Sequence, residues 1–138
     1  MFTYTRGDVY FDLLYHYPDH NESCEKLLLV LNKNHSNDQD VVIIPSATNK
    51  RNFTLKNGCN KTEKIYYIEK KSGFYHDKSM IQLEFVEGVP IKEFERRIAS
   101  KQMKSLRKQV TDQELQGILG CLKSIREDIP VEVYELIF

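Results

Sequence analysis

The stretch KLLLVLNKNHSNDQDVVIIPSATN, residues 26–49, decides the fold. It holds two short apolar runs, residues 27–31 and 41–44, joined by a polar segment that is typical of a loop. Short apolar runs bounded by turn residues are typical of buried strands, and the β-branched residues of the second run favour strand over helix. Ser46 and Thr48 follow this run. Polar residues at the end of a buried strand are held rigidly and still face solvent, so we expect chemistry there.

Length and composition predict a single globular domain over residues 1–138. The chain is 41% hydrophobic and 29% charged, as in ordinary folded proteins. Its 20 basic residues balance 20 acidic ones, so net charge neither favours nor excludes a polyanionic partner. The N-terminus lacks the pattern of a signal peptide, and no apolar run approaches the ~20 residues of a membrane helix. We therefore expect a cytoplasmic protein that does not bind a membrane.

The three cysteines lie far apart and include no Cys-x-x-Cys pair. The spacing of Cys24, Cys59 and Cys121 therefore predicts neither a disulfide framework nor a zinc site, and we expect no metal or other cofactor. Cys121 lies in the apolar run ILGCLKSI and is predicted to be a small core residue.

Strand patterns extend over residues 1–89. Residues 9–15 and 65–69 are rich in aromatic and β-branched residues, and residues 53–55 form a possible short strand. Residues 79–86, SMIQLEFV, alternate between apolar and more polar positions, which predicts a half-buried strand with Gln82 and Glu84 on its polar face.

Helical patterns extend over residues 90–127. Pro90 suits the first turn of one helix, and the basic segment 101–108 is predicted to be an exposed linker to a second helix. Thr111 is the predicted N-cap of that second helix, with Glu114 completing a capping box. Gly117 and Gly120 weaken the helix and indicate that it packs closely against another surface. The tail, residues 128–138, is compatible with a strand or a short helix.

The order of strands followed by helices predicts an α+β fold, either a compact curved sheet or a small barrel with helices at one end. The segments GDVYFDLL, KLLLVLN, VVIIPSATNK, IYYIEKKSGFYHDKSMIQLEF and VTDQELQGILGCLKSI occur in that order over residues 6–126. In their order and spacing they resemble the PemK/MazF/Kid toxins. That family has a Gly-Asp strand, a loop ending in Arg-Pro, VLVLS-type and VxPLTS-type strands, a later strand with an acidic residue before glutamine, and a closing helix.

The resemblance implies a small, half-open, strongly curved antiparallel β-barrel of the Src-homology-3-like kind, with helices following the strands, usually as a homodimer. It also implies the toxin of a toxin–antitoxin system. Such a toxin is a metal-independent endoribonuclease that cuts single-stranded RNA at short sequences and is held inactive by an antitoxin peptide laid across its groove. The 2′-hydroxyl of the RNA would be the nucleophile, which requires a base, an acid and donors to the phosphate.

The family's phosphate-handling residues are replaced in this chain. Its arginine before the second strand falls at Lys26, which keeps the positive charge but loses the bidentate fork. Its threonine aligns with Ala47, between Ser46 and Thr48, so that a shift by one residue would restore a hydroxyl.

Further substitutions fall on the late strand, where an arginine and an aspartate of some members align with Gln82 and Glu84. Glu84 can act as a base, whereas Gln82 has no proton to give at neutral pH. His16 and His20 in the first loop are imidazoles, a common general acid, and can replace the missing acid.

The resemblance therefore implies a catalytic set and a set of RNA contacts. The catalytic set is Lys26, Thr48, Glu84 and His16, and the RNA contacts are Ser46, Lys50, Arg51 and Gln82. The loss of the arginines favours an alternative, a catalytically inactive member of the same fold that binds nucleic acid or protein. A β-domain unrelated to the toxins is a third possibility.

Overall fold

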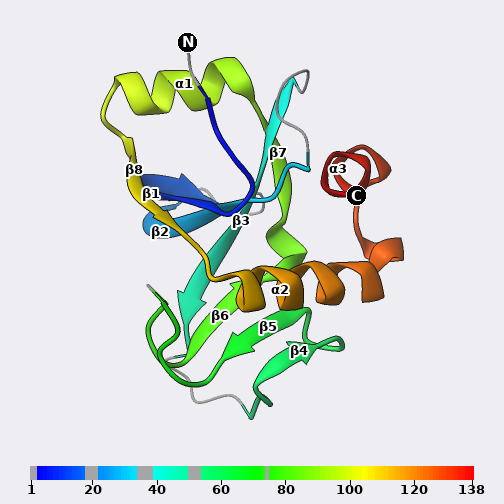
Figure 1. Cartoon of the computed structure of the whole chain (residues 1–138). Helices are drawn as coiled ribbons and strands as arrows, with labels where there is room; N and C mark the ends of the chain where they lie inside the picture. Colours follow the sequence, from blue (N-terminus) through cyan, green and yellow to red (C-terminus); the bar gives the residue numbers. More distant parts are fainter. Residues whose placement is uncertain (1–2, 18–21, 34–38, 50–53, 74) are drawn as a thin grey trace.

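The computed structural model describes residues 3–17, 22–33, 39–49, 54–73 and 75–138. They form an α+β fold with an eight-stranded antiparallel sheet that does not close and three helices, so the predicted class is confirmed (Figure 1). The strand order is β4-β5-β6-β3-β2-β1-β8, and β7 pairs separately with β3. The strands are β1 (Asp8–His16), β2 (Ser23–Val30), β3 (Asp40–Thr48), β4 (Gly58–Asn60), β5 (Ile65–Ile68), β6 (Ser79–Gln82), β7 (Glu87–Pro90) and β8 (Met103–Gln109).

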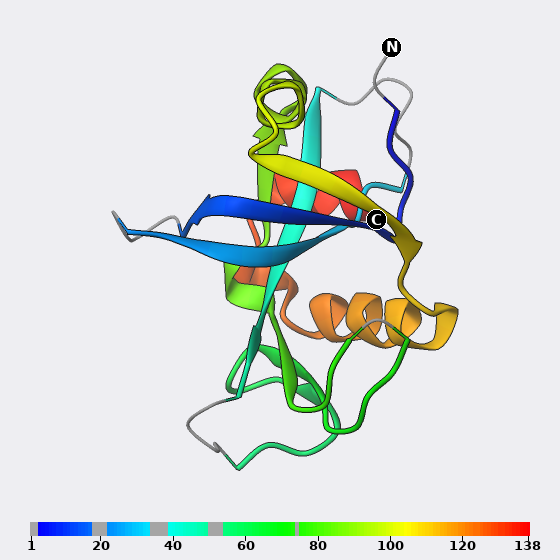
Figure 2. The same ribbon diagram turned by 90° about the vertical axis from the view of Figure 1, so that its left-hand side faces the viewer.

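Strand β3 is the centre of the sheet. It pairs with β2 along one edge, and on its other edge it pairs with β7 near its start and with β6 near its end. The two buried strands predicted from the apolar runs are therefore present, and β3 extends further than its apolar run. In Figure 2, β1 and β2 cross β3 at a steep angle, with α1 above the crossing and α2 below it.

The apolar runs of β2 and β3 are buried on both faces of the sheet, which explains why they are continuous rather than alternating. Leu29 and Ile44 belong to one core cluster, which includes residues of α2 (Asp112–Ser124) and α3 (Val131–Ile137). Leu28 and Ile43 point the other way, into a second cluster with Phe94 of α1 (Ile91–Ala99). Neighbouring residues in each strand thus face different cores.

The prediction of one strand over residues 79–86 is wrong after Gln82. Strand β6 ends there, and a 3-10 turn, η1 (Leu83–Phe85), follows. The amide of Leu83 donates to the carbonyl of Lys64 in the turn before β5, and the chain then re-enters the sheet as β7 beside the first half of β3. Glu84 consequently lies on a turn and not beside Gln82 on a strand face.

The basic segment 101–108 is not the exposed linker that was predicted. It contains most of strand β8, which pairs antiparallel with β1. The prediction of helices over residues 90–127 is therefore wrong for this segment, where Met103 begins a strand. Residues 54 and 55 are not in a strand, and Phe53 lies outside the described residues.

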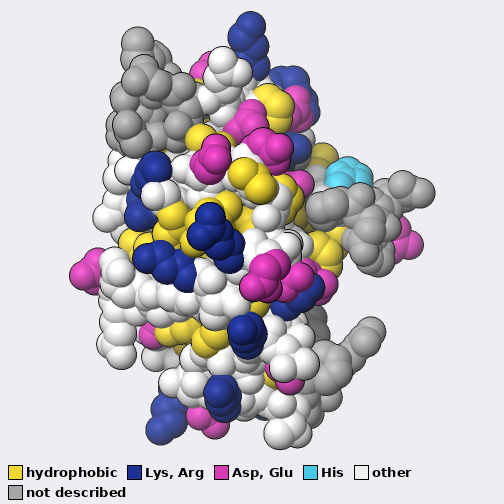
Figure 3. Space-filling model, turned by 90° about the vertical axis from the view of Figure 1, so that its right-hand side faces the viewer, with side chains coloured by type: hydrophobic (Ala, Val, Ile, Leu, Met, Phe, Trp, Pro, Cys, Tyr) yellow, Lys and Arg dark blue, Asp and Glu magenta, His cyan; other side chains and the backbone are white. Residues whose placement is uncertain are grey.

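The predicted helices are present. Pro90 is the N-cap residue directly before α1, and the Thr111 hydroxyl accepts a hydrogen bond from the amide of Glu114 at the start of α2, as expected for that cap. The tail forms helix α3. None of the described helices is long and apolar enough to cross a membrane. On the face that contains α3, basic, acidic and hydrophobic side chains lie side by side (Figure 3).

Cys59 and Cys121 form a disulfide, whereas the cysteine spacing predicted no disulfide framework. Strand β4 packs against α2, and this contact brings together two Cα atoms that are 62 residues apart in sequence to within 5.4 Å. Cys121 is buried as predicted, but as half of a cross-link. Cys24 is the free cysteine among the described residues.

A buried ion pair attaches α1 to the sheet. Asp12 of β1 is fully buried, and its carboxylate lies 3.6 Å from the Arg97 guanidinium of α1. The other carboxylate oxygen accepts hydrogen bonds from the Leu14 amide and the Gln102 side chain. Arg97 also hydrogen-bonds to Glu93. The ion pair and the two hydrogen bonds to Oδ1 offset part of the cost of burying this charge, while Oδ2 accepts no hydrogen bond from the described residues.

Candidate functional site

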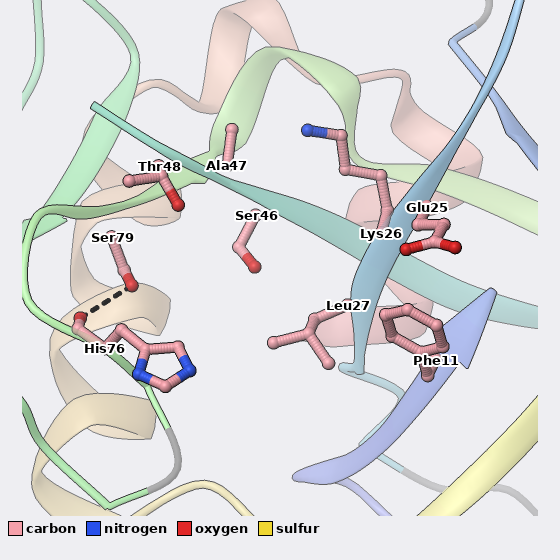
Figure 4. Close-up of a pocket in the computed structure, with 9 residues that line it drawn as sticks. All are labelled: Phe11, Glu25, Lys26, Leu27, Ser46, Ala47, Thr48, His76 and Ser79. Carbon is pink, nitrogen blue, oxygen red and sulfur yellow. Dashed lines mark hydrogen bonds between the residues drawn. The ribbon is translucent and has the colours of Figure 1, made fainter. Parts of the chain in front are cut away.

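An open cavity of about 360 Å³ lies at the end of β3, where the sequence predicts the site (Figure 4). Its size is within the range of small-ligand sites, ~300–1,000 Å³. Side chains from β1, β2, β3, β6 and the connection that precedes β6 line it: Phe11, Glu25, Lys26, Leu27, Ser46, Ala47, Thr48, His76 and Ser79.

Three hydroxyl groups line this cavity from two paired strands. Ser46 and Thr48 lie two residues apart on β3, so their side chains point to the same face of the sheet. Thr48 is paired with Ser79 of β6, which puts a third hydroxyl on that face. The Ser79 hydroxyl donates a hydrogen bond of 2.7 Å to the backbone carbonyl of His76. This bond fixes the turn that carries His76 beside the strand ends.

His76 is one of the lining residues that the sequence did not predict. It is exposed, and its imidazole lies beside the Ser79 side chain, on the same side of β3 as the Ser46 and Thr48 hydroxyls (Figure 4). The only signal in the sequence is its position three residues before a predicted strand. That signal becomes meaningful once β6 is known to pair with the end of β3.

Lys26 borders the same cavity, but its ammonium group lies on the other side of β3, together with Ala47 (Figure 4). The ammonium lies over the Tyr17 ring, 5.4 Å from the ring centroid. The Tyr17 hydroxyl in turn donates a 2.9 Å hydrogen bond to the Gln82 side chain. The sheet therefore separates Lys26 and Gln82 from the hydroxyls of Ser46 and Thr48.

The far end of the cavity holds an acidic and an aromatic side chain. Glu25 is exposed and Phe11 is half-buried, and both lie across the cavity from His76 (Figure 4). The sequence reasoning singled out neither residue. Glu25 and Leu27 are two residues apart on β2, so their side chains point to the same face of the sheet, the one that holds the hydroxyls.

The other predicted site residues do not join this group. Glu84 is exposed on η1, and His16 is exposed at the last position of β1; neither lines the cavity. His20, Lys50 and Arg51 lie outside the described residues. The structure thus brings together Ser46 and Thr48 from the predicted set, and it adds Ser79 and His76.

Within the described ranges, no group of three or more His, Cys, Asp and Glu side chains is arranged to hold a metal ion. The cavity instead offers hydroxyl groups, one imidazole, one carboxylate at its far end and the side chain of Lys26 at its border. Hydroxyl donors and an imidazole suit an anionic, oxygen-rich ligand such as a phosphodiester.

Comparisons with known proteins give no further assignment. No protein-family model matches the chain, and no curated protein matches it significantly.

Proposed function

We propose that the cavity binds the backbone of single-stranded RNA and that the protein is an endoribonuclease, the toxin of a toxin–antitoxin pair. One observation carries the proposal: the hydroxyls of Ser46, Thr48 and Ser79 and the imidazole of His76 line a single open cavity. The order of segments that resembles the PemK/MazF/Kid toxins supports the same function.

The proposed reaction uses the RNA's own 2′-hydroxyl. His76 accepts the proton of that hydroxyl, and the resulting oxygen nucleophile attacks the adjacent phosphorus. The bond from phosphorus to the 5′-oxygen breaks, and the leaving oxygen takes a proton from solvent, which reaches the open cavity. The Ser46 and Thr48 hydroxyls donate hydrogen bonds to the non-bridging oxygens, where negative charge increases. Ser79 keeps its hydrogen bond to the His76 carbonyl and so holds the turn that carries the imidazole.

Phe11 offers a half-buried aromatic face at the other end of the cavity. A base of the bound strand stacks on this ring in the proposed complex, because base–aromatic stacking is the usual way in which proteins hold single-stranded RNA.

The rest of the toxin hypothesis belongs to the same proposal. In it the curved sheet is a half-open barrel of the Src-homology-3-like kind, the protein acts as a cytoplasmic homodimer, and an antitoxin peptide occupies the groove. The steep crossing of β1 and β2 over β3 supports the strong curvature that a half-open barrel requires (Figure 2). The Cys59–Cys121 disulfide counts against the cytoplasm, because disulfides persist mainly in oxidising compartments.

A second function, a catalytically inactive module that binds nucleic acid or protein through the same cavity, is favoured by one observation. The charged groups that catalysis would use are dispersed: Glu25 lies across the cavity from His76, and Lys26 lies on the other side of β3. A site of this kind can hold a phosphodiester without cleaving it.

Incubation of the purified protein with end-labelled single-stranded RNA in EDTA separates the two functions. The endoribonuclease predicts cleavage products that carry a 2′,3′-cyclic phosphate, and a His76→Gln variant that cleaves about 10²–10⁴-fold more slowly. His16→Gln is the matched control and retains the wild-type rate. Binding of the RNA by the wild-type protein without cleavage would leave the binding module as the function.

A further inference from the structure

We propose that a second cavity, next to the first, binds further phosphates of the same RNA strand through Lys71 and Lys108. This inference rests on the proposed function, because it extends the ligand of that site. The second cavity measures about 480 Å³ and is lined by Leu27, Lys71, Gly73, His76, Leu106 and Lys108.

The two cavities share Leu27 and His76 as lining residues. They are therefore adjacent along the surface, and His76 lies at the point where they meet. A linear ligand that occupies the first cavity can continue past His76 into the second. A single phosphate or a mononucleotide would leave one of them empty.

An apolar floor continues through both cavities. It consists of Phe11 on β1, Leu27 on β2 and Leu106 on β8, which are all half-buried. These strands are neighbours in the order β2-β1-β8, so the three side chains lie on adjacent strands. Sugars and bases of a single strand pack against such a surface.

Positive charge borders this floor in the second cavity. Lys71 comes from the connection between β5 and β6 and Lys108 from β8, and both side chains are exposed. No acidic side chain is among the described residues that line this cavity. Neither lysine forms an ion pair within the described part of the chain. Both ammonium groups are thus free to neutralise phosphates.

The two adjacent cavities together form one groove. A single-stranded nucleic acid fits this groove better than an acidic peptide does. The groove combines an aromatic ring, an apolar floor and cations along one path, which is the arrangement that proteins use for bases and backbone together. An acidic peptide would use the cations but would leave the Phe11 face without a matching planar group.

The test measures binding without cleavage. A fluorescent 2′-O-methyl RNA of about eight nucleotides lacks the attacking hydroxyl and spans both cavities. Its affinity for the full chain is measured by anisotropy over a range of salt concentrations. Each phosphate contact contributes about 0.7 to the slope of log affinity against log salt for single strands. The slope is negative, and we therefore expect Lys71→Gln with Lys108→Gln to make it shallower by about 1.4.

The control is the double variant Lys61→Gln with Lys92→Gln, which removes the same charge from lysines that line neither cavity. It is expected to keep the wild-type slope. An equal fall in both double variants, or no change in the first, would overturn the subsite. The proposal would also be overturned if the oligonucleotide did not bind and poly-glutamate bound in a way that depends on Lys71 and Lys108. The groove would then be a binding site for an acidic peptide.

The experiment distinguishes failure of the proposed subsite from failure of the proposed endoribonuclease activity. If the oligonucleotide binds with the lysine-dependent slope while the unmodified RNA stays intact, the subsite stands and the endoribonuclease does not.

Discussion

Leu27 of β2 lies directly opposite Ser46 of β3 in the antiparallel pair. Because directly opposed residues project to the same face, this register puts the Ser46 hydroxyl on the side of Leu27 and away from Lys26. A register shifted by one residue would bring Lys26 together with the hydroxyls. The pairing of these two residues therefore decides which side chains form the site.

The first prediction follows from that register. Thr48→Val removes a hydroxyl donor from the cavity, and we expect RNA cleavage to slow by about 10²-fold. Lys26→Met is the matched comparison, because Lys26 borders the same cavity while its ammonium lies on the opposite face over Tyr17. We expect the methionine variant to cleave at the wild-type rate and to lose only the cation–π contact, ~0.5–1 kcal/mol of stability. Rates of cleavage of a labelled RNA check both; a slow Lys26→Met with a fast Thr48→Val would place the ligand on the Tyr17 face.

The two glycines of α2 predict opposite effects on stability. A Cβ at Gly117 would lie 2.2 Å from the Tyr66 hydroxyl oxygen, whereas a Cβ at Gly120 meets nothing within 4 Å. Gly120→Ala is therefore expected to raise the free energy of unfolding by up to ~1 kcal/mol through helix propensity. Gly117→Ala is expected to lower it by about 1–3 kcal/mol through overpacking. Urea unfolding of the two variants measures both, and equal effects would contradict the close contact at Gly117.

The disulfide predicts a redox-dependent stability. Cys59→Ser with Cys121→Ser opens a cross-link that spans 62 residues. A loop of this length contributes about 4 kcal/mol in the chain-entropy model, so we expect a loss of ~2–4 kcal/mol. Urea unfolding without reductant measures the loss, and addition of dithiothreitol should bring the wild-type protein to the value of the variant. Cys24→Ser, which changes the free cysteine, serves as control and should behave as wild type in both conditions.

Glu87 predicts a dependence of stability on pH. Burial raises the pKa of this half-buried carboxyl above its usual value, and the nearby Arg97 only partly opposes the rise. The folded state therefore holds this proton more tightly than the unfolded state does. The stability that it contributes is complete below the unfolded pKa, about 4.3, and is lost as pH rises through the folded pKa.

We therefore expect Glu87→Gln to be more stable than the wild-type protein at pH 7, with the difference shrinking as the pH falls to 4. Thermal unfolding of the pair at several pH values measures it. A wild-type protein that is the more stable of the two at pH 7 would show that the contact with Arg97 outweighs burial.

Local pattern was enough to predict much of the secondary structure. The continuous apolar runs at 27–31 and 41–44 predict buried strands because a strand covered on both faces excludes polar side chains. Thr111 with Glu114 predicts the start of α2 because a cap is a contact between residues three positions apart. Residues 101–108 were not predicted as a strand. Strand β8 carries few buried side chains, and its pairing with β1 depends on residues about ninety positions away.

The candidate site also contains some residues that local pattern predicts and others that depend on long-range pairing. From the sequence alone, the end of the second apolar run is predicted to hold the candidate site, and Ser46 and Thr48 are predicted as two of its side chains, because alternation along one strand is local. Only the tertiary structure could add His76, Ser79 and Glu25, and only it could move Lys26 to the other face or pair Cys59 with Cys121. Those relationships depend on which strands are neighbours and in which register, and pairing between distant segments is fixed by packing of the whole core.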